Sequence, residues 1–173
     1  HMHVVAVLPW AHVYGLACDL HLYIAAGGGI AFAESVEKLI QNFQEVKPTG
    51  LCVVPKIVNK VYDSILQGVA ADPTKKLFFD AAVAEAIKNR DLPEKTKEFK
   101  DYDALVFSQC RKIFGGDLKF FVTGSAMVKP EIAMFFKDIG QPTFDGYGMT
   151  EAGPVITSNT PKYGNKLGTV GKV

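Results

Sequence analysis

A glycine-rich segment near the carboxyl end of the chain carries side chains suited to nucleotide chemistry. Gly146 and Gly148 flank Tyr147, so the backbone can approach a ligand closely while an aromatic ring is presented between the glycines. Thr150 and Glu151 follow, and their hydroxyl and carboxylate suit a phosphate oxygen and its Mg²⁺. An aromatic face, a hydroxyl and a metal-binding acid this close together predict a nucleotide site.

The spacing alone leaves other interpretations open. The glycines resemble the start of the dinucleotide fingerprint GxGxxG, but Glu151 occupies its sixth position, so that fingerprint fits poorly. An ordinary glycine turn with a surface glutamate has the same pattern.

Two further segments follow apolar runs in the same way. They are Leu8–Gly15, which contains His12, and Val122–Met127, which contains Gly124 and Ser125. Open α/β sheets place their ligands at the carboxyl ends of strands, so we expect these loops to meet the glycine-rich segment. Position alone gives His12 no chemical role, because a histidine at a strand edge can simply be satisfied by its neighbours.

The elements that must position these loops are short apolar strands separated by helix-length segments. This alternation predicts an α/β fold with a largely parallel β-sheet flanked by helices. The expected strands lie at Val4–Leu8, Ile30–Phe32, Leu51–Val54, Leu118–Val122, Thr143–Asp145 and Val155–Thr157.

Three helices are predicted from apolar spacing and capping residues. One begins at Pro55, one follows Pro130 and stops at Gly140, and one has Asp72 as its cap with Pro73 behind it. The side chains expected on the buried face of the helix after Asp72 are Leu77, Phe78, Ala81 and Ala82.

Composition excludes several classes of protein. The net charge of +1 argues against a nucleic-acid partner, and no run approaches the roughly 18 apolar residues of a membrane span. Residues from about 70 to 104 are rich in charges of both signs, which predicts a solvated helical excursion. Three widely spaced cysteines indicate buried thiols in a reducing, intracellular compartment. Residues 1–2 look like a tag remnant.

Five segments together resemble the adenylate-forming enzymes, the superfamily of acyl- and aryl-CoA synthetases, luciferases and peptide-synthetase adenylation domains. FDGYGMTEAGP resembles the family's YGxTE signature, LPWAHVYG its LPxxHxxG segment, and VTGSAMVKPE its GSAPL adenine loop. LCVVPKIVNKVYD is similar to the VPR-and-helix element and LGTVGKV to the GxVGxP stretch. The resemblance implies that residues 3–173 are a partial AMP-binding domain, a subdomain of the family's N-terminal domain.

The resemblance also implies a reaction and roles for residues. Family members join a carboxylate to ATP, release pyrophosphate, and pass the acyl group from the adenylate to CoA. By resemblance Tyr147 lies against adenine, Thr150 contacts the α-phosphate, Glu151 holds Mg²⁺, and His12 lies near the carboxylate of the acid. The remaining expected nucleotide contacts are Gly124, Ser125, Ala126, Asp145, Gly146, Gly148 and Met149, of which Asp145 could instead be a turn cap.

Within the superfamily, the charged excursion and the segment that returns from it are similar to long-chain fatty acyl-CoA synthetases. The expected function is therefore that of an acid–thiol ligase, with ATP, Mg²⁺, CoA and a long-chain fatty acid as cofactors and substrates. An aryl-CoA ligase, another adenylate-former and a catalytically silent acyl or nucleotide binder remain alternatives. Met127 replaces the family's usual proline and Lys56 its arginine. We expect the chain alone to be inactive, and any peripheral membrane association, for example with an organelle or the endoplasmic reticulum, to use segments outside it.

Overall fold

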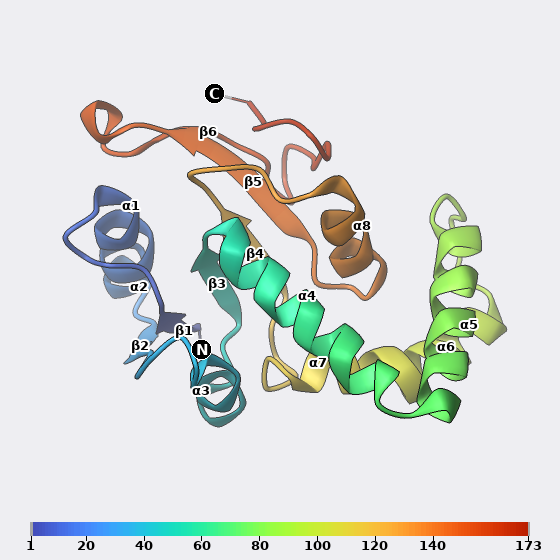
Figure 1. Ribbon diagram of the computed structural model, residues 1–173. Coiled ribbons are helices and arrows are strands. Elements are labelled where there is room, and N and C mark those ends of the chain that lie inside the picture. Colours follow the sequence, from blue (N-terminus) through green and yellow to red (C-terminus); the bar gives the residue numbers. More distant parts are fainter. Residues whose placement is uncertain (1, 173) are drawn as a thin grey trace.

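The computed structural model describes residues 2–172, and its strands form two hydrogen-bonded sheets (Figure 1). The smaller sheet is a parallel pair, and the larger one has the order β3-β4-β5-β6, parallel except for the antiparallel pairing of β5 with β6. The strands are β1 (His3–Ala6), β2 (Gly29–Phe32), β3 (Gly50–Val53), β4 (Phe120–Thr123), β5 (Thr143–Gly148) and β6 (Val155–Ser158). The predicted α/β class is confirmed, with the strands divided between two sheets.

The helices connect and flank these strands. They are α1 (Val13–Gly15), α2 (Leu22–Ala25), α3 (Leu39–Val46), α4 (Pro55–Ala70), α5 (Pro73–Asn89), α6 (Lys97–Tyr102), α7 (Ser108–Lys112) and α8 (Pro130–Asp138). A π-helical turn, Leu16–His21, joins α1 to α2, and another, Asp103–Phe107, joins α6 to α7. None of the helices in residues 2–172 has the length and apolar character needed to cross a membrane.

The predicted helix starts are confirmed. α4 begins at Pro55 and α8 at Pro130, and Asp72 caps α5 by accepting hydrogen bonds from the amides of Thr74 and Lys75 at 2.9 and 3.3 Å. The Asp72 cap satisfies backbone donors that the first helical turn leaves without partners, whereas the prolines that begin α4 and α8 carry no N–H to satisfy.

The predicted buried face of α5 is wrong at two positions. Leu77 and Phe78 are 70% and 52% exposed, whereas Phe79 and Ala82 are buried. Because three apolar residues are adjacent here, the sequence does not decide which of them faces the core. In the structure Phe79 does, and its ring centroid lies 5.9 Å from that of Phe135 in α8.

Aromatic rings fill the core between the larger sheet and its helices. Phe121 of β4 lies 5.2 Å from Phe136 of α8 and 5.1 Å from Phe114, measured between ring centroids, in edge-to-face arrangements. All three side chains are essentially inaccessible to water. Such pairs favour a fixed relative position of helix and sheet, and α8 begins shortly after the loop that follows β4.

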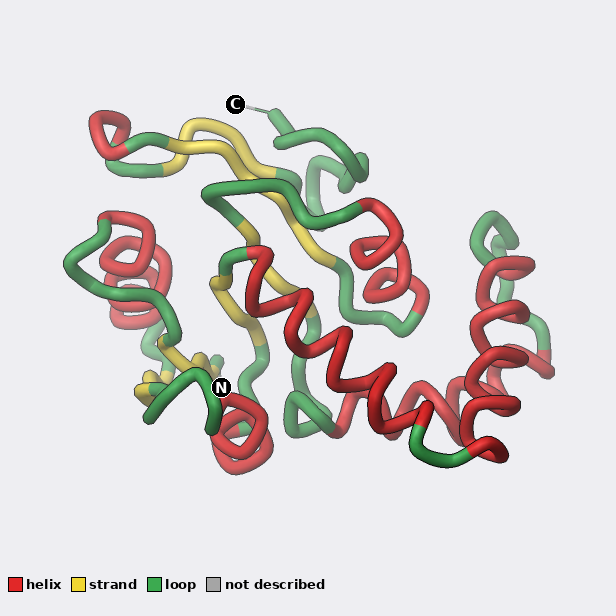
Figure 2. The backbone as a smooth tube through the Cα atoms, in the orientation of Figure 1, coloured by secondary structure: helices red, strands yellow, loops and turns green. Residues whose placement is uncertain are grey.

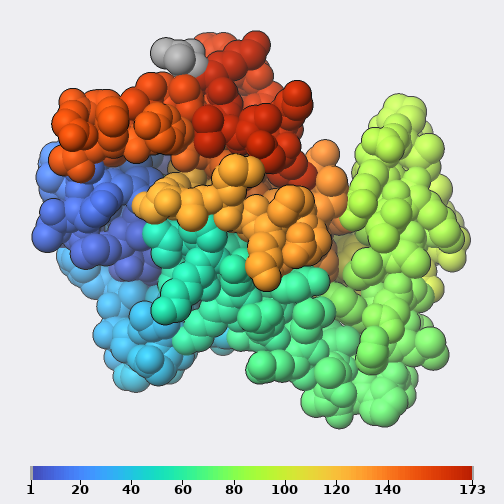
Figure 3. Space-filling model, turned by 45° about the horizontal axis from the view of Figure 1, so that its top comes forward, coloured from blue at the N-terminus to red at the C-terminus, as the bar shows by residue number. Residues whose placement is uncertain are grey.

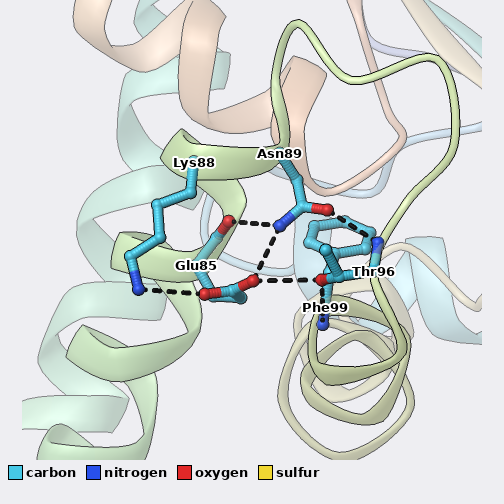
Figure 4. A network of polar contacts seen from close by, with 5 residues as sticks. All are labelled: Glu85, Lys88, Asn89, Thr96 and Phe99. Carbon is cyan, nitrogen blue, oxygen red and sulfur yellow. Dashed lines mark hydrogen bonds and ion pairs between the residues drawn. The ribbon is translucent and has the colours of Figure 1, made fainter.

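The charged segment is helical, as predicted, and stands apart from the strands (Figure 2). A polar network ties its turn together (Figure 4): the buried Asn89 side chain donates to the Glu85 carboxylate at 2.8 Å and accepts from the Thr96 amide at 2.8 Å. Thr96 also donates to Glu85 at 3.0 Å and caps α6 by accepting from the Phe99 amide. The excursion is therefore an ordered helical corner.

Candidate active site

A cavity of about 370 Å³ lies where the loops after β1, β4 and β5 meet. In Figure 3 the β5–β6 tip, drawn in orange, lies over the blue segment that follows β1. The cavity is lined by His12, Val13, Tyr14, Val122, Thr123, Gly124, Ser125, Gly146, Tyr147, Gly148, Met149, Thr150, Glu151, Pro154, Val155 and Ser158. The loops that the sequence analysis singled out are thus brought together.

Most of the predicted site residues line this cavity. Those that do are His12, Gly124, Ser125, Gly146, Tyr147, Gly148, Met149, Thr150 and Glu151. Two do not. Ala126 is exposed one residue beyond the cavity wall, and Asp145 is buried.

The Asp145 side chain points toward β4. Its carboxylate accepts a hydrogen bond from the Thr123 hydroxyl, and its backbone carbonyl accepts from the Asn159 amide at 3.0 Å. In this arrangement Asp145 joins two strands just below the cavity, while its proposed contact to a base edge stays a prediction.

The β5–β6 hairpin presents Tyr147 at the mouth of the cavity. Gly148 approaches Pro154 so closely that an added Cβ would lie 2.1 Å from the Pro154 carbonyl oxygen. The Met149 amide donates to that same oxygen at 2.9 Å. The Tyr147 ring, next to this tight closure, is half exposed and lines the cavity, so it can contact a planar ligand.

The loop after β4 forms the opposite wall. Ser125 has φ 69°, a left-handed conformation that is uncommon for a residue other than glycine. Gly124 lies against the Tyr14 ring, where an added Cβ would be 3.2 Å from two ring carbons. A side chain at position 124 would therefore compete with Tyr14 for space.

Tyr14 forms the floor between these walls. Its hydroxyl donates to the Val122 carbonyl at 3.0 Å and lies 3.4 Å from the Val53 carbonyl, at the carboxyl ends of β4 and β3. Burial raises the pKa of the Tyr14 phenol well above its usual value, so it stays neutral and acts as a donor. From the sequence, Tyr14 could line the route of the acyl group or merely pack; its hydroxyl contacts could not be predicted, because they join residues far apart in the chain.

His12 begins the short helix α1 beside the cavity. Its Nδ1 accepts a hydrogen bond from the Tyr14 amide at 3.1 Å. A neutral imidazole that accepts at Nδ1 carries its proton on Nε2. His12 is exposed and can therefore offer an Nε2–H donor to an acceptor in the cavity, such as a carboxylate.

Thr150 and Glu151 form a single 3₁₀ turn, Thr150–Ala152, that Gly153 ends in a left-handed conformation. Both side chains are exposed at the cavity. Within residues 2–172 no group of three or more His, Cys, Asp or Glu side chains could hold a metal ion. Glu151 therefore fits Mg²⁺ only in the mode where one carboxylate and several phosphate and water oxygens complete the coordination.

These features define an α/β domain whose candidate nucleotide site lies at the carboxyl ends of its parallel strands. The family model described as "AMP-binding enzyme" matches residues 1–173. The chain belongs to this family of AMP-binding, adenylate-forming enzymes.

Curated relatives include long-chain acyl-CoA synthetases. The chain is 31% identical to the peroxisomal long chain acyl-CoA synthetase 7 of Arabidopsis thaliana, over 89% of this chain and 22% of that protein. It is 30% identical to the long-chain-fatty-acid–CoA ligase 5 of Rattus norvegicus, over 89% of this chain and 23% of that protein. The chain thus spans about a quarter of the length of the curated relatives it matches.

Solved structures of the family share the fold. The A domain of a carboxylic acid reductase from Segniliparus rugosus, in complex with AMP and a carboxylic acid, matches with a TM-score of 0.61 and 22% identity over 90% of this chain and 21% of that one. A benzoate CoA ligase from Burkholderia xenovorans matches with a TM-score of 0.61 and 19% identity over 99% of this chain and 27% of that one. At these identities the likeness concerns the fold alone.

Proposed function

We propose that this chain forms part of the adenylation site of an ATP-dependent long-chain fatty acyl-CoA synthetase. The observation that carries the proposal is the single cavity in which the loop of His12, the loop of Gly124 and the hairpin of Tyr147 meet. The names of the curated relatives support the long-chain substrate class.

Each wall of the cavity has a task in this proposal. The exposed face of Tyr147 stacks on adenine, and the backbone around Gly124 closes the opposite side. Thr150 donates to the α-phosphate, and the His12 Nε2–H orients the carboxylate that attacks it.

Glu151 would hold Mg²⁺, which neutralises the charge that develops on the phosphate oxygens when it is bound. Thr150 and Glu151 come from one short turn and both line the cavity, so the hydroxyl and the carboxylate that would hold the metal would serve the same bound nucleotide. In the second half-reaction the acyl group passes to the thiol of CoA, and AMP leaves the cavity.

The test is fatty-acid-dependent exchange of pyrophosphate into ATP by the full synthetase that the proposal implies, comparing palmitate, octanoate and a cinnamate. We expect exchange with palmitate, and a fall of about 100-fold or more in Glu151→Ala because metal-assisted charge stabilisation is lost. Glu131→Ala is the matched control, since Glu131 is an exposed carboxylate in the first turn of α8, away from the cavity.

The other outcomes point to the alternative functions. Exchange with cinnamate but not palmitate indicates an aryl-CoA ligase, and exchange with none of the acids indicates a silent binder. If Glu131→Ala lost as much exchange as Glu151→Ala, the proposed role of Glu151 would be wrong.

The wider setting follows from the same proposal. A synthetase of this class acts inside the cell on ATP, CoA and a fatty acid, without a nucleic-acid partner. Peripheral attachment to an organelle membrane would come from segments outside residues 1–173.

A further inference from the structure

A completely buried carboxyl group lies behind the cavity, and the proposed chemistry does not use it. Asp19 sits in the π-helical turn Leu16–His21 with no exposed surface. Its Oδ1 has no hydrogen-bond partner among the described residues. Burial raises the pKa of Asp19 to about 7, although nearby donors partly oppose the shift.

The groups that face Asp19 are neutral or weakly acidic. Cys52 reaches it from β3, and Cys18 is its neighbour in the turn. Tyr14 and Tyr23 lie near enough that the Asp19 charge adds to the effect of burial in raising the pKa of both phenols. β1 also contacts the turn and carries one titratable residue, His3, at its opposite end. His21 lies in the same turn, but Asp19 forms no ion pair with it or with any lysine or arginine in residues 2–172, and an uncompensated buried acid costs stability.

The contact that Asp19 does make leads to the loop of His12. Asp19 Oδ2 lies 3.4 Å from the amide nitrogen of Leu8, the residue at which this loop begins after β1. The next part of the loop is a turn, in which the His12 backbone amide donates to the Pro9 carbonyl at 3.0 Å.

The other side of the loop rests on the backbone of α1. An added Cβ on Gly15 would lie 2.7 Å from the Pro9 carbonyl oxygen and 3.0 Å from the Leu8 Cβ. Leu8 thus contacts Gly15 on one side and Asp19 on the other, and the Tyr14 amide donates to His12 Nδ1 at the end of the loop.

We propose that Asp19 is a positioning residue for His12. Its carboxylate accepts the Leu8 amide and holds the loop so that the His12 imidazole keeps Nδ1 on the helix cap and turns Nε2–H toward the cavity. The proposal rests on the proposed function of that cavity, where the donor would meet a substrate carboxylate.

A dependence on pH follows from the chemistry of a carboxyl group. Ionised Asp19 is a strong acceptor for the Leu8 amide, whereas protonated Asp19 is a weak one. The loop is therefore held best above about pH 7, the value to which burial raises the pKa of Asp19. Below it the Leu8 contact weakens and the His12 ring gains freedom.

The experiment is NMR of the chain labelled with ¹⁵N, without nucleotide or acid, from about pH 5 to about pH 9. We expect the Leu8 amide to titrate with a midpoint near neutral pH in the wild type and in His12→Asn, and to lose that titration in Asp19→Asn. At about pH 8.5, long-range ¹⁵N–¹H spectra should show the Nε2–H tautomer of His12 in the wild type and a mixture of tautomers in Asp19→Asn. Asp117→Asn removes an exposed carboxylate and serves as the control.

If Asp19 had a purely structural role, the His12 tautomer would not depend on it. The proposal is overturned if the His12 tautomer in Asp19→Asn stays as in the wild type, or if the wild-type Leu8 amide shows no titration. The wild-type titration needs no variant, so the Asp19–Leu8 contact on which the proposal depends can be overturned even where Asp19→Asn folds poorly. Adding AMP to the same sample then tests the cavity separately, because binding moves the Tyr147 signals whether or not Asp19 positions His12.

Discussion

At the scale of single residues, the candidate site depends on places where only a backbone fits. Gly148 meets the Pro154 carbonyl and has no room for a side chain, and a side chain at Gly124 would have to displace the Tyr14 ring. The site is therefore shaped by close backbone contacts as much as by the side chains that would carry the chemistry.

Gly148→Ala should lower the free energy of unfolding by about 1–3 kcal/mol, because the new methyl group forces the β5–β6 hairpin open. Gly68→Ala is the matched control. Gly68 lies in α4 with no atom within 4 Å of an added Cβ, so alanine there should stabilise by about 0.5–1 kcal/mol. Urea denaturation measures both, and equal effects of the two variants would contradict the contact that we describe.

Asp19 should make stability fall as pH rises. Its pKa is raised to about 7 in the folded chain, so between about pH 4 and pH 7 the folded state holds a proton that the unfolded state has released. The slope from this group is at most about 1.4 kcal/mol per pH unit, and it ends above pH 7. Urea denaturation at a series of pH values should show this slope in the wild type and in Asp117→Asn but not in Asp19→Asn. Parallel curves for the wild type and Asp19→Asn would disprove it.

At the scale of elements, the sequence predicts where helices begin better than how they face. Pro55, Pro130 and Asp72 mark their helix starts through local capping chemistry, which needs no knowledge of the rest of the fold. The face of α5 is set instead by Phe135 of α8, a residue far along the chain, so Leu77 was assigned to the wrong side.

The same difference between local and distant contacts applies to the site. The loops could be predicted because each follows an apolar strand, and parallel strands bring their carboxyl ends together. The hydroxyl of Tyr14 on two strand ends and the carboxylate of Asp19 on the Leu8 amide could not, because neither contact leaves a pattern in the sequence.

The corner between α5 and α6 provides a test of which contacts hold an element in place. Asn89→Ala should lower the free energy of unfolding by about 1–2 kcal/mol, because the Glu85 carboxylate and the Thr96 amide each lose the hydrogen bond to the Asn89 side chain, while Glu85 keeps its bond from the Thr96 hydroxyl. Lys88→Met should cost less than about 0.5 kcal/mol, since the Lys88 side chain is 71% exposed and its ion pair with Glu85 is screened by water. Thermal unfolding of both variants checks this, and a larger loss in Lys88→Met would reverse our ranking.

At the scale of the whole molecule, apolar side chains remain exposed around the smaller sheet. Ile24 of α2 and Phe32 of β2 are 63% and 64% exposed. Because exposed apolar patches favour association, the chain should form oligomers at high concentration, and Ile24→Ser with Phe32→Ser should reduce them. Light scattering over a dilution series measures this, and the exposed polar change Lys162→Ser is the control. If the Ile24→Ser, Phe32→Ser double variant associated as strongly as Lys162→Ser, the surface through which the chains associate would lie elsewhere.

The charge around the cavity predicts what the chain can and cannot do by itself. Among its lining residues Glu151 is the one carboxylate, and no lysine or arginine is present. The triphosphate of ATP carries several negative charges that need cationic partners, whereas AMP needs little beyond an aromatic face and a few donors. The 173-residue chain should therefore bind AMP at least as tightly as ATP, with Tyr147→Ala weakening AMP binding about tenfold through lost stacking.

For the same reason the chain alone should form no acyl-CoA from palmitate, ATP, Mg²⁺ and CoA. Calorimetry and mass spectrometry measure the two results. Clear preference for ATP, or a thioester above the level of a protein-free control, would show that the described cavity holds more of the catalytic machinery than its lining residues indicate.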